Sequence, residues 1–395
     1  MRVLHLSWEY PPVVYGGLGR HVHALARAQA QRGDEVVVIT QQDTSPTADL
    51  LPEDETVDGV RIIRVRPDAP GVPDWRTRFI EWCFGFNVAV ARAAIGISRT
   101  WRPDVLHGHD WLVGQAAVIA SEATGVPFVL TVHATESGRM NGVLASEQSQ
   151  AIDATEAWSV DHADALIVCS TAMRDEVLEL FDADPALLTV VPNGVDPGEW
   201  TTSPARKRRM RERYGSPLVA YCGRLEDEKG VQTLIDAVGM LRTTEPDARA
   251  VIIGTGSALP RLRARARRRD LLDAVTFTGF IDDADVRAII AAADVAVVPS
   301  LYEPFGFVAL EAMALGAPLV VSRTGGLAEI VDDGVTGWHA EPGDAVDLAR
   351  VLGEVLDAPR LARARARAAR VAVEERYGWV AIAERTDSVY RSVTG

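Results

Sequence analysis

The alternation of short apolar runs with helical patterns is the feature that most constrains the fold of this chain. The runs are continuous rather than alternating with polar residues, which is typical of parallel strands buried on both faces. They form two series, so we expect an α/β fold with two doubly wound, Rossmann-like domains. The first series comprises 3–6, 36–39, 60–65, 105–107, 128–132, 165–169 and 188–191, and the second 218–222, 250–254, 275–279, 295–299 and 319–322.

Helical patterns separate several of these runs. They cover 19–32, 75–102 and 111–124 in the first series, and 231–242, 260–270, 283–292, 307–314 and 346–356 in the second. The pattern breaks at 197–217, so we place the two domains at 1–197 and 198–377. A length of 395 residues suits two domains of roughly 200 each. The end of the chain, 377–394, is again helical in pattern.

Composition narrows the class of protein. Hydrophobic residues make up 47% and charged residues 24%, as in ordinary globular proteins. The apolar runs are shorter than the roughly 20 residues of a membrane span, and no signal peptide precedes the first run. We therefore expect a cytoplasmic protein without an integral membrane segment. The net charge of −14 argues against nucleic-acid binding. The arginine clusters 206–213 and 261–269 favour solvated helix faces, with peripheral membrane contact as the alternative.

Cysteine and lysine usage adds two constraints. Cys83, Cys169 and Cys222 are widely spaced, which favours reduced thiols and excludes a zinc ribbon or a disulfide framework. The chain has only two lysines, Lys207 and Lys229, and otherwise uses arginine. A lysine kept in such a chain indicates a need for a compact charge.

Two carboxylates with seven residues between them, Glu303 and Glu311, follow the apolar run 295–299. Pro304 suits the first position of a helix, and Gly316 suits its end. Glu303 would then lie at the start of the helix and Glu311 about two turns inside, roughly 12 Å along the axis. A single molecule with a sugar at one end and a ribose at the other could contact both carboxylates.

The N–H groups of Phe305, Gly306 and Phe307 lie between the two acids and could donate to such a hydroxyl-rich ligand. The alternative is a helix with one acid favoured by its dipole and a second acid on a solvated face. The segment, with its Pro-Phe-Gly and the downstream Gly325-Gly326, resembles the E-x7-E signature of retaining glycosyltransferases of family 4, which have the two-domain GT-B fold.

Arg224 and Lys229 follow the run 218–222 and precede a predicted helix. Two cations beside a helix N-terminus can clamp a pyrophosphate and neutralise the charge of a leaving diphosphate. The alternative is a solvated pair among the acids 226–228. The segment resembles the G-R-(x)n-K-G element of family 4, in which these residues replace a metal.

Two glycine motifs support the same resemblance. Gly254-Thr-Gly256 follows a strand and in the family lies near the nucleobase and ribose, although it can also serve only as a turn. Gly16 and Gly17 lie between the first strand and first helix, and their backbone can approach a phosphate. This loop resembles that of bacterial glycogen synthases, except that Val14 stands where they usually carry a lysine.

Histidines end two strands of the first series. The segment His107-Gly-His109-Asp110 can be interpreted as a metal site, but it resembles the H-x-H-D of family 4, which belongs to the sheet edge and acceptor cleft. His133 matches the family's histidine beside the transferred sugar, where the alternative is a core histidine.

The resemblance covers nearly the whole chain and implies a retaining glycosyltransferase that needs no metal and no cofactor. It implies that Arg224 and Lys229 neutralise the diphosphate, that Glu303 holds the sugar and that Glu311 binds the ribose. His133 would bind a sugar hydroxyl or offer a carbonyl near the anomeric carbon. It also implies a cleft between the domains, with the donor on the second, and a terminal helix 378–395 that returns to the first.

The substrates follow from the same resemblance. Glycogen-synthase-like α-glucosyltransferases imply ADP-glucose or UDP-glucose as donor and an α-glucan or small glycoside as acceptor. Four aromatic residues near strand ends could stack on sugar rings, although aromatics at such places are as often core residues: Trp8, Tyr10, Tyr15 and Trp111. One alternative is a family 4 mannosyl- or N-acetylglucosaminyltransferase acting on a lipid or inositol acceptor. Alternatives of other classes are a nucleotide-sugar epimerase, a sugar-nucleotide sensor without catalysis, and a phosphorylase, which would need a lysine for pyridoxal phosphate.

Overall fold

The computed structural model describes residues 1–42, 51–67 and 78–395. The chain divides into two compact units, here called unit 1 and unit 2. Unit 1 contains Met1–Gly194 and Trp379–Gly395, and unit 2 contains Val195–Gly378. The first crossing between the units therefore falls after residue 194 rather than after residue 197, and the returning segment begins at residue 379.

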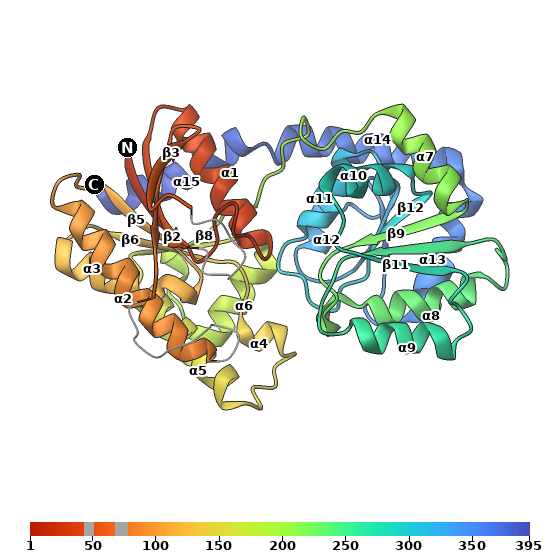
Figure 1. Cartoon of the computed structure of the whole chain (residues 1–395), viewed down its shortest axis with the longest axis horizontal. Helices are drawn as coiled ribbons and strands as arrows, with labels where there is room; N and C mark the ends of the chain where they lie inside the picture. Colours follow the sequence, from red (N-terminus) through yellow and green to blue (C-terminus); the bar gives the residue numbers. More distant parts are fainter. Residues whose placement is uncertain (43–50, 68–77) are drawn as a thin grey trace. The chain divides into compact units, whose positions relative to one another are not determined.

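Unit 1 is built on an eight-stranded sheet with the order β3-β4-β2-β1-β5-β6-β7-β8 (Figure 1). Neighbouring strands run parallel except β3 and β4, which are antiparallel. The sequence predicted a wholly parallel sheet and missed β3, because its segment Asp-Glu-Thr-Val is largely polar and lies at an exposed edge. The strands are β1 (Arg2–Leu6), β2 (Glu35–Gln41), β3 (Asp54–Val57), β4 (Val60–Val65), β5 (Val105–His109), β6 (Phe128–Val132), β7 (Ala165–Val168) and β8 (Leu188–Val190).

Helices cover this sheet, and the last one comes from the end of the chain. Tyr390 and Ile382 of that helix share a buried cluster with Val3 and Val105 of the sheet, so the terminal segment is part of the core of unit 1. The helices are α1 (Gly17–Gln31), α2 (Phe79–Ser98), α3 (Gly114–Thr124), α4 (Glu136–Arg139), α5 (Glu147–Asp161), α6 (Thr171–Phe181) and α15 (Trp379–Thr394), with short 3-10 turns η1 (Trp111–Val113) and η2 (Pro185–Leu187). The first residues of the helix expected at 75–102 lie outside the described residues.

Within the described ranges, α2 is the one helix long and apolar enough to cross a membrane by length and composition. Its most apolar 18-residue window is 56% buried inside the structure. Trp82, Phe86 and Val90 form its buried face, and α3 and the sheet pack against the helix. This is the packing of a core helix.

Unit 2 is built on a six-stranded parallel sheet with the order β11-β10-β9-β12-β13-β14. The strands are β9 (Leu218–Cys222), β10 (Arg249–Ile253), β11 (Val275–Gly279), β12 (Val295–Val298), β13 (Leu319–Ser322) and β14 (Trp338–Ala340). The helices are α7 (Pro204–Tyr214), α8 (Val231–Leu241), α9 (Leu259–Arg268), α10 (Asp283–Ala292), α11 (Phe307–Ala314), α12 (Leu327–Ile330), α13 (Ala345–Asp357) and α14 (Pro359–Arg376), with the 3-10 turn η3 (Asp227–Lys229). Each unit therefore contains one of the two α/β domains that the strand pattern predicts.

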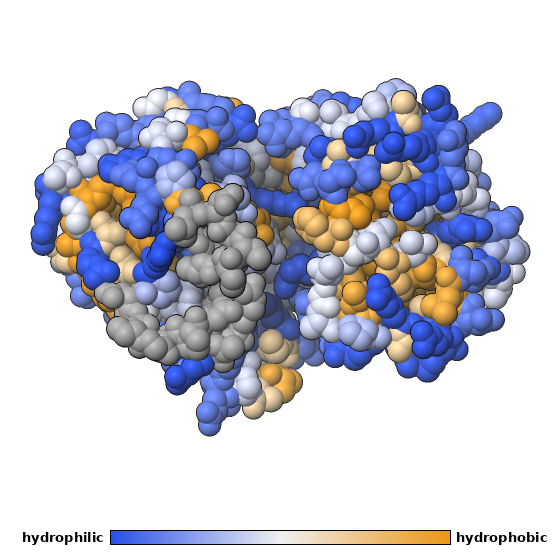
Figure 2. Space-filling model, in the orientation of Figure 1, coloured by the Kyte–Doolittle hydropathy of each residue, from blue (hydrophilic) through white to orange (hydrophobic). Residues whose placement is uncertain are grey.

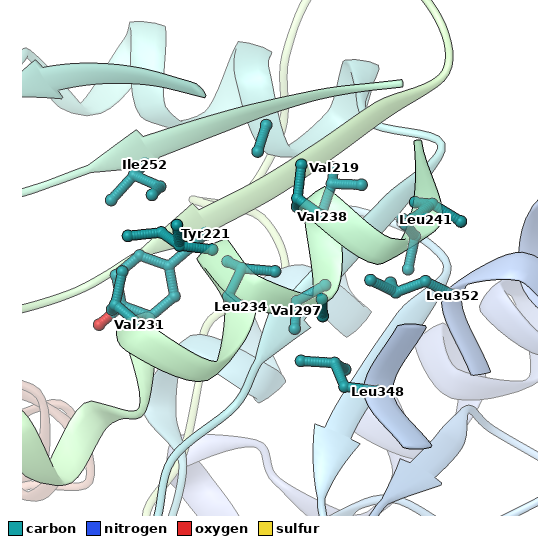
Figure 3. Close-up of a cluster of buried hydrophobic side chains, with 14 of the residues drawn as sticks. Val219, Tyr221, Val231, Leu234, Val238, Leu241, Ile252, Val297, Leu348 and Leu352 are labelled. Atoms are coloured by element: carbon teal, nitrogen blue, oxygen red, sulfur yellow. The ribbon is translucent and has the colours of Figure 1, made fainter. Parts of the chain in front are cut away.

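The core of unit 2 forms where α8 and α13 lie on the sheet, as Figure 3 shows. Val231, Leu234 and Val238 recur at helical spacing on the inner face of α8, and all three are fully buried. Each such side chain contributes about 1.5–3 kcal/mol by leaving water. This packing fixes η3 and the start of α8 at the carboxyl end of the sheet.

The arginine clusters lie on the outer faces of α7 and α9, where they form ion pairs. Arg206 contacts Asp285, and Arg261 contacts Asp227. Hydrophilic residues cover much of the face drawn in Figure 2, and apolar residues form separate patches on it. These exposed ion pairs fit solvated helix faces, and peripheral membrane contact stays an untested alternative. Among the described residues, Cys83 and Cys169 are buried and Cys222 is partly buried, and none of the three is joined in a disulfide.

Candidate active site

Lys229 and Glu303 form an ion pair at the carboxyl edge of the sheet in unit 2. Lys229 ends the turn η3 after β9, and Glu303 lies in the loop after β12; the two strands are parallel neighbours. Lys229 Nζ donates to Glu303 Oε2 over 3.0 Å, and Ser300 Oγ donates to the same oxygen over 3.1 Å. The two charged side chains are 17% and 16% exposed, so solvent or a ligand can reach them.

Two glycines allow the backbone approaches that place this pair. Gly230 has φ +67°, and a Cβ there would lie 1.9 Å from the carbonyl oxygen of Pro299. Gly325 has φ +47°, and a Cβ there would lie 2.1 Å from the carbonyl oxygen of Glu303. Only glycine fits both the positive φ and the missing space. The loops after β9, β12 and β13 can therefore pack together behind the charged side chains.

Arg224 lies on the loop that leads from β9 to Lys229. The buried phenol of Tyr221 donates to the carbonyl oxygen of Arg224 over 2.8 Å. Burial raises the pKa of Tyr221, so this donor keeps its proton. The Arg224 side chain is 53% exposed and pairs with Glu228 over 3.3 Å. Each cation of the expected clamp thus has a carboxylate partner. Because the Arg224 side chain is half-exposed, another anion can replace Glu228 as its partner.

The helix that carries Glu311 begins at Phe307, as the pattern at 307–314 predicts, and not at Pro304. Gly306, with φ +117°, is the N-cap of α11, and Phe307 is its first residue. Pro304 therefore precedes the helix, because the positive φ of Gly306 interrupts it. Glu311 lies four residues after Phe307, about 6 Å along the axis, and not two turns inside. It is only 4% exposed, which excludes the alternative of an acid on a solvated face.

Phe305 lies under this loop rather than on its surface. It is 4% exposed, and its ring meets those of Phe307 and Tyr377 edge to face at 5.6 and 6.3 Å. The side chain anchors the turn, so any contact of Phe305 with a ligand would be made by its backbone.

Gly254 and Gly256 are explained by packing between two loops. Gly254 has φ +132°, and a Cβ there would lie 2.0 Å from the carbonyl oxygen of Gly223. A Cβ at Gly256 would lie 2.3 Å from the carbonyl oxygen of Leu225. The loops after β9 and β10 are thus in backbone contact, and the expected contact of Gly254 with a donor stays a prediction.

In unit 1, the N-terminus of α1 is occupied by a carboxylate that the sequence interpretation gave no role. Gly16 is the N-cap and Gly17 the first helical residue. Glu9 Oε2 accepts from the N–H groups of Tyr15 and Gly16 over 2.7 and 2.9 Å. Burial raises the pKa of Glu9, which is 7% exposed. A phosphate bound through the Gly16 amide would have to displace Glu9, and that contact stays a prediction.

His133 follows β6 beside Asp110, which follows β5. Asp110 Oδ1 accepts from the His133 backbone N–H over 2.7 Å, and burial raises the pKa of Asp110 to about 6. Asp110 holds φ +62°, an uncommon value for a residue other than glycine. Such outliers gather at functional sites, where the surrounding structure enforces them.

The buried histidines of unit 1 lie close enough together for two metal-ligand sets, one of which is His21, His109 and His133. The other consists of His5, His107 and His109. However, His109 already contacts His5 over 3.1 Å and His133 over 3.3 Å in hydrogen bonds. A metal would have to replace these bonds, and the metal-free interpretation stays a prediction.

The aromatic residues expected to stack on sugars are mostly in the core. Trp8, Tyr10 and Trp111 are 5%, 3% and 7% exposed, so their rings serve packing. Tyr15 is the exception at 43% exposed, and its ring lies 5.6 Å from that of Trp8. Tyr15 is therefore the one of the four that a sugar could reach.

Comparison with known proteins identifies the family. The family model "Glycosyl transferase 4-like domain" matches residues 16–194, and "Glycosyl transferases group 1" matches residues 204–372. The chain is 43% identical to a glycogen synthase of Mycobacterium tuberculosis, over 99% of this chain and 94% of that one. The chain belongs to this family of glycosyltransferases. Its enzymatic class is thereby established.

Two further relatives share nearly their whole length with this glycosyltransferase. An α-maltose-1-phosphate synthase of Mycolicibacterium smegmatis is 31% identical, with 100% of both chains covered. The structure of sucrose-phosphate synthase from Thermosynechococcus elongatus matches with a TM-score of 0.85 at 26% identity, over 99% of this chain and 98% of that one. The two α/β domains predicted from the strand pattern and the GT-B fold implied by the resemblance are both confirmed.

Proposed function

We propose that the protein is a retaining, metal-independent glucosyltransferase that moves glucose from ADP-glucose or UDP-glucose to an α-glucan. The observation that carries the proposal is the Lys229–Glu303 pair at the carboxyl edge of β9 and β12, where open α/β sheets bind their ligands. The α-glucan acceptor is supported by the 43% identity to a protein named glycogen synthase.

The pair suggests how the reaction is assisted. The leaving nucleoside diphosphate develops negative charge, and a preorganised cation stabilises that charge as it forms. Lys229 supplies this cation, and the half-exposed Arg224 supplies a second. Because a diphosphate competes with Glu303 for Lys229, donor binding frees the Glu303 carboxylate to hold the sugar and stabilise its oxocarbenium-like transition state. Glu311 binds the ribose, and His133 binds a sugar hydroxyl.

A second candidate acceptor is a small phosphorylated sugar, and one observation favours it. Arg139 is 28% exposed, and its guanidinium lies 3.3 Å from each of two buried acidic side chains, Glu136 and Glu156. A partly exposed guanidinium can bind a phosphate through paired, charge-assisted hydrogen bonds. The names of two of the relatives above, α-maltose-1-phosphate synthase and sucrose-phosphate synthase, specify a sugar phosphate as the product.

A donor panel crossed with acceptors tests both candidates. The donors are ADP-glucose, UDP-glucose, GDP-mannose and UDP-N-acetylglucosamine; the acceptors are maltooligosaccharides, glucose 1-phosphate, inositol phosphate and a lipid extract. We expect glucan chains to lengthen with a glucose donor and with retention of the α-configuration, read by mass and anomeric linkage. Transfer to glucose 1-phosphate alone supports the second candidate.

Matched variants locate the acceptor. Arg139→Gln should raise the KM for glucose 1-phosphate and leave the KM for maltooligosaccharides unchanged. Arg174→Gln is the control, because Arg174 is a surface arginine paired with Asp175. Labelling of lipid or inositol without glucan would contradict both candidates, and donor binding without transfer to any acceptor would favour a sensor.

A further inference from the structure

A chain of buried polar side chains runs from α1 through the sheet of unit 1 to His133. Gln29 Oε1 lies 2.7 Å from His5 Nε2, His5 Nδ1 lies 3.1 Å from His109 Nε2, and His109 Nδ1 lies 3.3 Å from His133 Nε2. Gln29, His5 and His109 are fully buried, and His133 is the partly exposed end. The three rings belong to β1, the end of β5 and the loop after β6.

The chain has a fixed polarity, because each contact joins Nδ1 of one imidazole to Nε2 of the next. A hydrogen bond between two neutral imidazoles holds one proton, since each ring has one N–H and one lone pair. Burial lowers the pKa of His5, His109 and His133, so all three rings are neutral at physiological pH. The ring nitrogen that carries the proton in one imidazole therefore determines which nitrogen carries it in the next.

The Gln29 amide supplies the starting condition. Its carbonyl oxygen faces His5 and can only accept, so His5 carries its proton on Nε2. The amide nitrogen of Gln29, Nε2, donates to the Tyr390 hydroxyl over 3.2 Å, so the other end of the amide also has a partner. The Tyr390 hydroxyl in turn lies 2.6 Å from His107 Nδ1, so both polar ends of the amide have a partner.

We propose that Gln29 sets the tautomer of His133 through His5 and His109, so that all three imidazoles carry their proton on Nε2. His133 then presents Nδ1 as a hydrogen-bond acceptor at the carboxyl end of the sheet. Gln29, His5 and His109 are positioning residues, because they act on His133 and not on a substrate.

The consequence for catalysis rests on the proposed function. A sugar hydroxyl that meets His133 would donate its proton to Nδ1, and the wrong tautomer would present an N–H to it instead. Selection of the tautomer by the buried chain keeps His133 ready for that contact in every molecule. The tautomer itself can be measured without any substrate, which separates this proposal from the assignment of the reaction.

The test is a long-range ¹H–¹⁵N correlation spectrum of the full-length protein labelled at histidine, which distinguishes protonated from unprotonated ring nitrogens. The chain has eight histidines, so single substitutions of His5, His109 and His133 suffice for assignment. We expect the Nε2–H tautomer on all three rings. The Nδ1–H tautomer on His133, or different tautomers along the chain, would overturn the proposal.

Gln29→Met tests the origin of the selection, because methionine keeps the length and removes both polar ends. We expect His133 to lose its single tautomer in this variant. The control is Gln31→Met on the exposed face of the same helix, which should leave the spectrum unchanged. An unchanged His133 tautomer in folded Gln29→Met would refute the role of Gln29. If that variant does not fold, the wild-type spectrum still decides.

The kinetic counterpart distinguishes the two proposals from each other. In Gln29→Met we expect kcat to fall several-fold, with the KM for the nucleotide-sugar unchanged. A single Nε2–H tautomer in a protein that transfers no sugar would refute the proposed function alone. Full activity of Gln29→Met with a mixed tautomer would show that the tautomer does not assist the reaction, and would overturn the positioning role.

Discussion

Substitution of Lys229 by methionine removes one cation and leaves a carboxylate behind. Methionine is similar in length, so the change is mainly one of charge. In the substituted protein, Glu303 keeps the hydroxyl of Ser300 as a donor but loses its ion-pair partner at 3.0 Å. Two separate effects are therefore expected, one on the stability of the free protein and one on the reaction.

The magnitude for the reaction follows from the distance and the exposure. If Lys229 approaches the diphosphate as closely as it approaches Glu303, at 3.0 Å, it interacts with one unit of negative charge by about 5.5 kcal/mol at an effective dielectric constant of about 20. Lys229 is 17% exposed, so water partly replaces it when it is removed. A net loss of about 2–4 kcal/mol of transition-state stabilisation remains, which corresponds to a decrease in kcat/KM of about 30- to 1000-fold.

The assay is initial-rate transfer from the donor that the panel identifies, with thermal unfolding measured in parallel. The chain offers a matched control, because Lys207, its only other lysine, is exposed on α7. Lys207→Met should keep wild-type kcat/KM. The free energy of unfolding of Lys229→Met should be lower by about 1–2 kcal/mol, because a partly buried carboxylate has lost a partner. The variant should therefore unfold at a lower temperature.

The double variant Lys229→Met/Glu303→Gln separates the two effects. It should regain stability, since no unpaired charge remains, and it should stay inactive. The reasoning is refuted if Lys229→Met retains kcat/KM within about threefold, or if Lys207→Met loses as much activity as Lys229→Met.

Three further predictions follow from the same site. Activity should survive EDTA, since Lys229 and Arg224 supply the positive charge; loss with EDTA and recovery with magnesium would contradict this. Glu303→Ala should depress kcat with little change in nucleoside diphosphate affinity, whereas Glu311→Ala should weaken that affinity; equal effects in calorimetry would argue against separate roles. Gly325→Ala should lower the free energy of unfolding by more than about 2 kcal/mol, because its Cβ would overlap the Glu303 carbonyl at 2.1 Å; a denaturation midpoint like that of wild type would show that the loop relaxes instead.

Local patterns in the sequence determined the architecture of this protein. A continuous apolar run is buried along its whole length only in a sheet that is covered on both faces. The bounds of β6, β9, β11 and β13 agree with the predicted runs for this reason. The E-x7-E and G-R-(x)n-K-G motifs placed Glu303 and Lys229 at strand ends. The structure shows that the two side chains form an ion pair at 3.0 Å, a contact that the sequence analysis did not predict.

Other features depended on partners that the local sequence does not reveal. β3 is polar and becomes a strand only because β4 offers an open edge. Pro304 suits the first position of a helix but lies before α11, because Gly306 has a φ of +117° in a space where Leu327 Cδ2 would lie 2.6 Å from a Cβ. In each case a residue distant in sequence outweighs the local preference.

The burial of individual side chains was the property that only the tertiary structure decided. Trp8, Tyr10 and Trp111 look like sugar-binding aromatics in the sequence but are core residues, while Glu9 takes the helix N-terminus that a phosphate was expected to use. The chain from Gln29 to His133 joins α1 to three neighbouring strand ends, and no spacing in the sequence predicts it. Periodicity depends on neighbours along the chain and is therefore visible in sequence, whereas desolvation and hydrogen-bond partners depend on which segments meet in space.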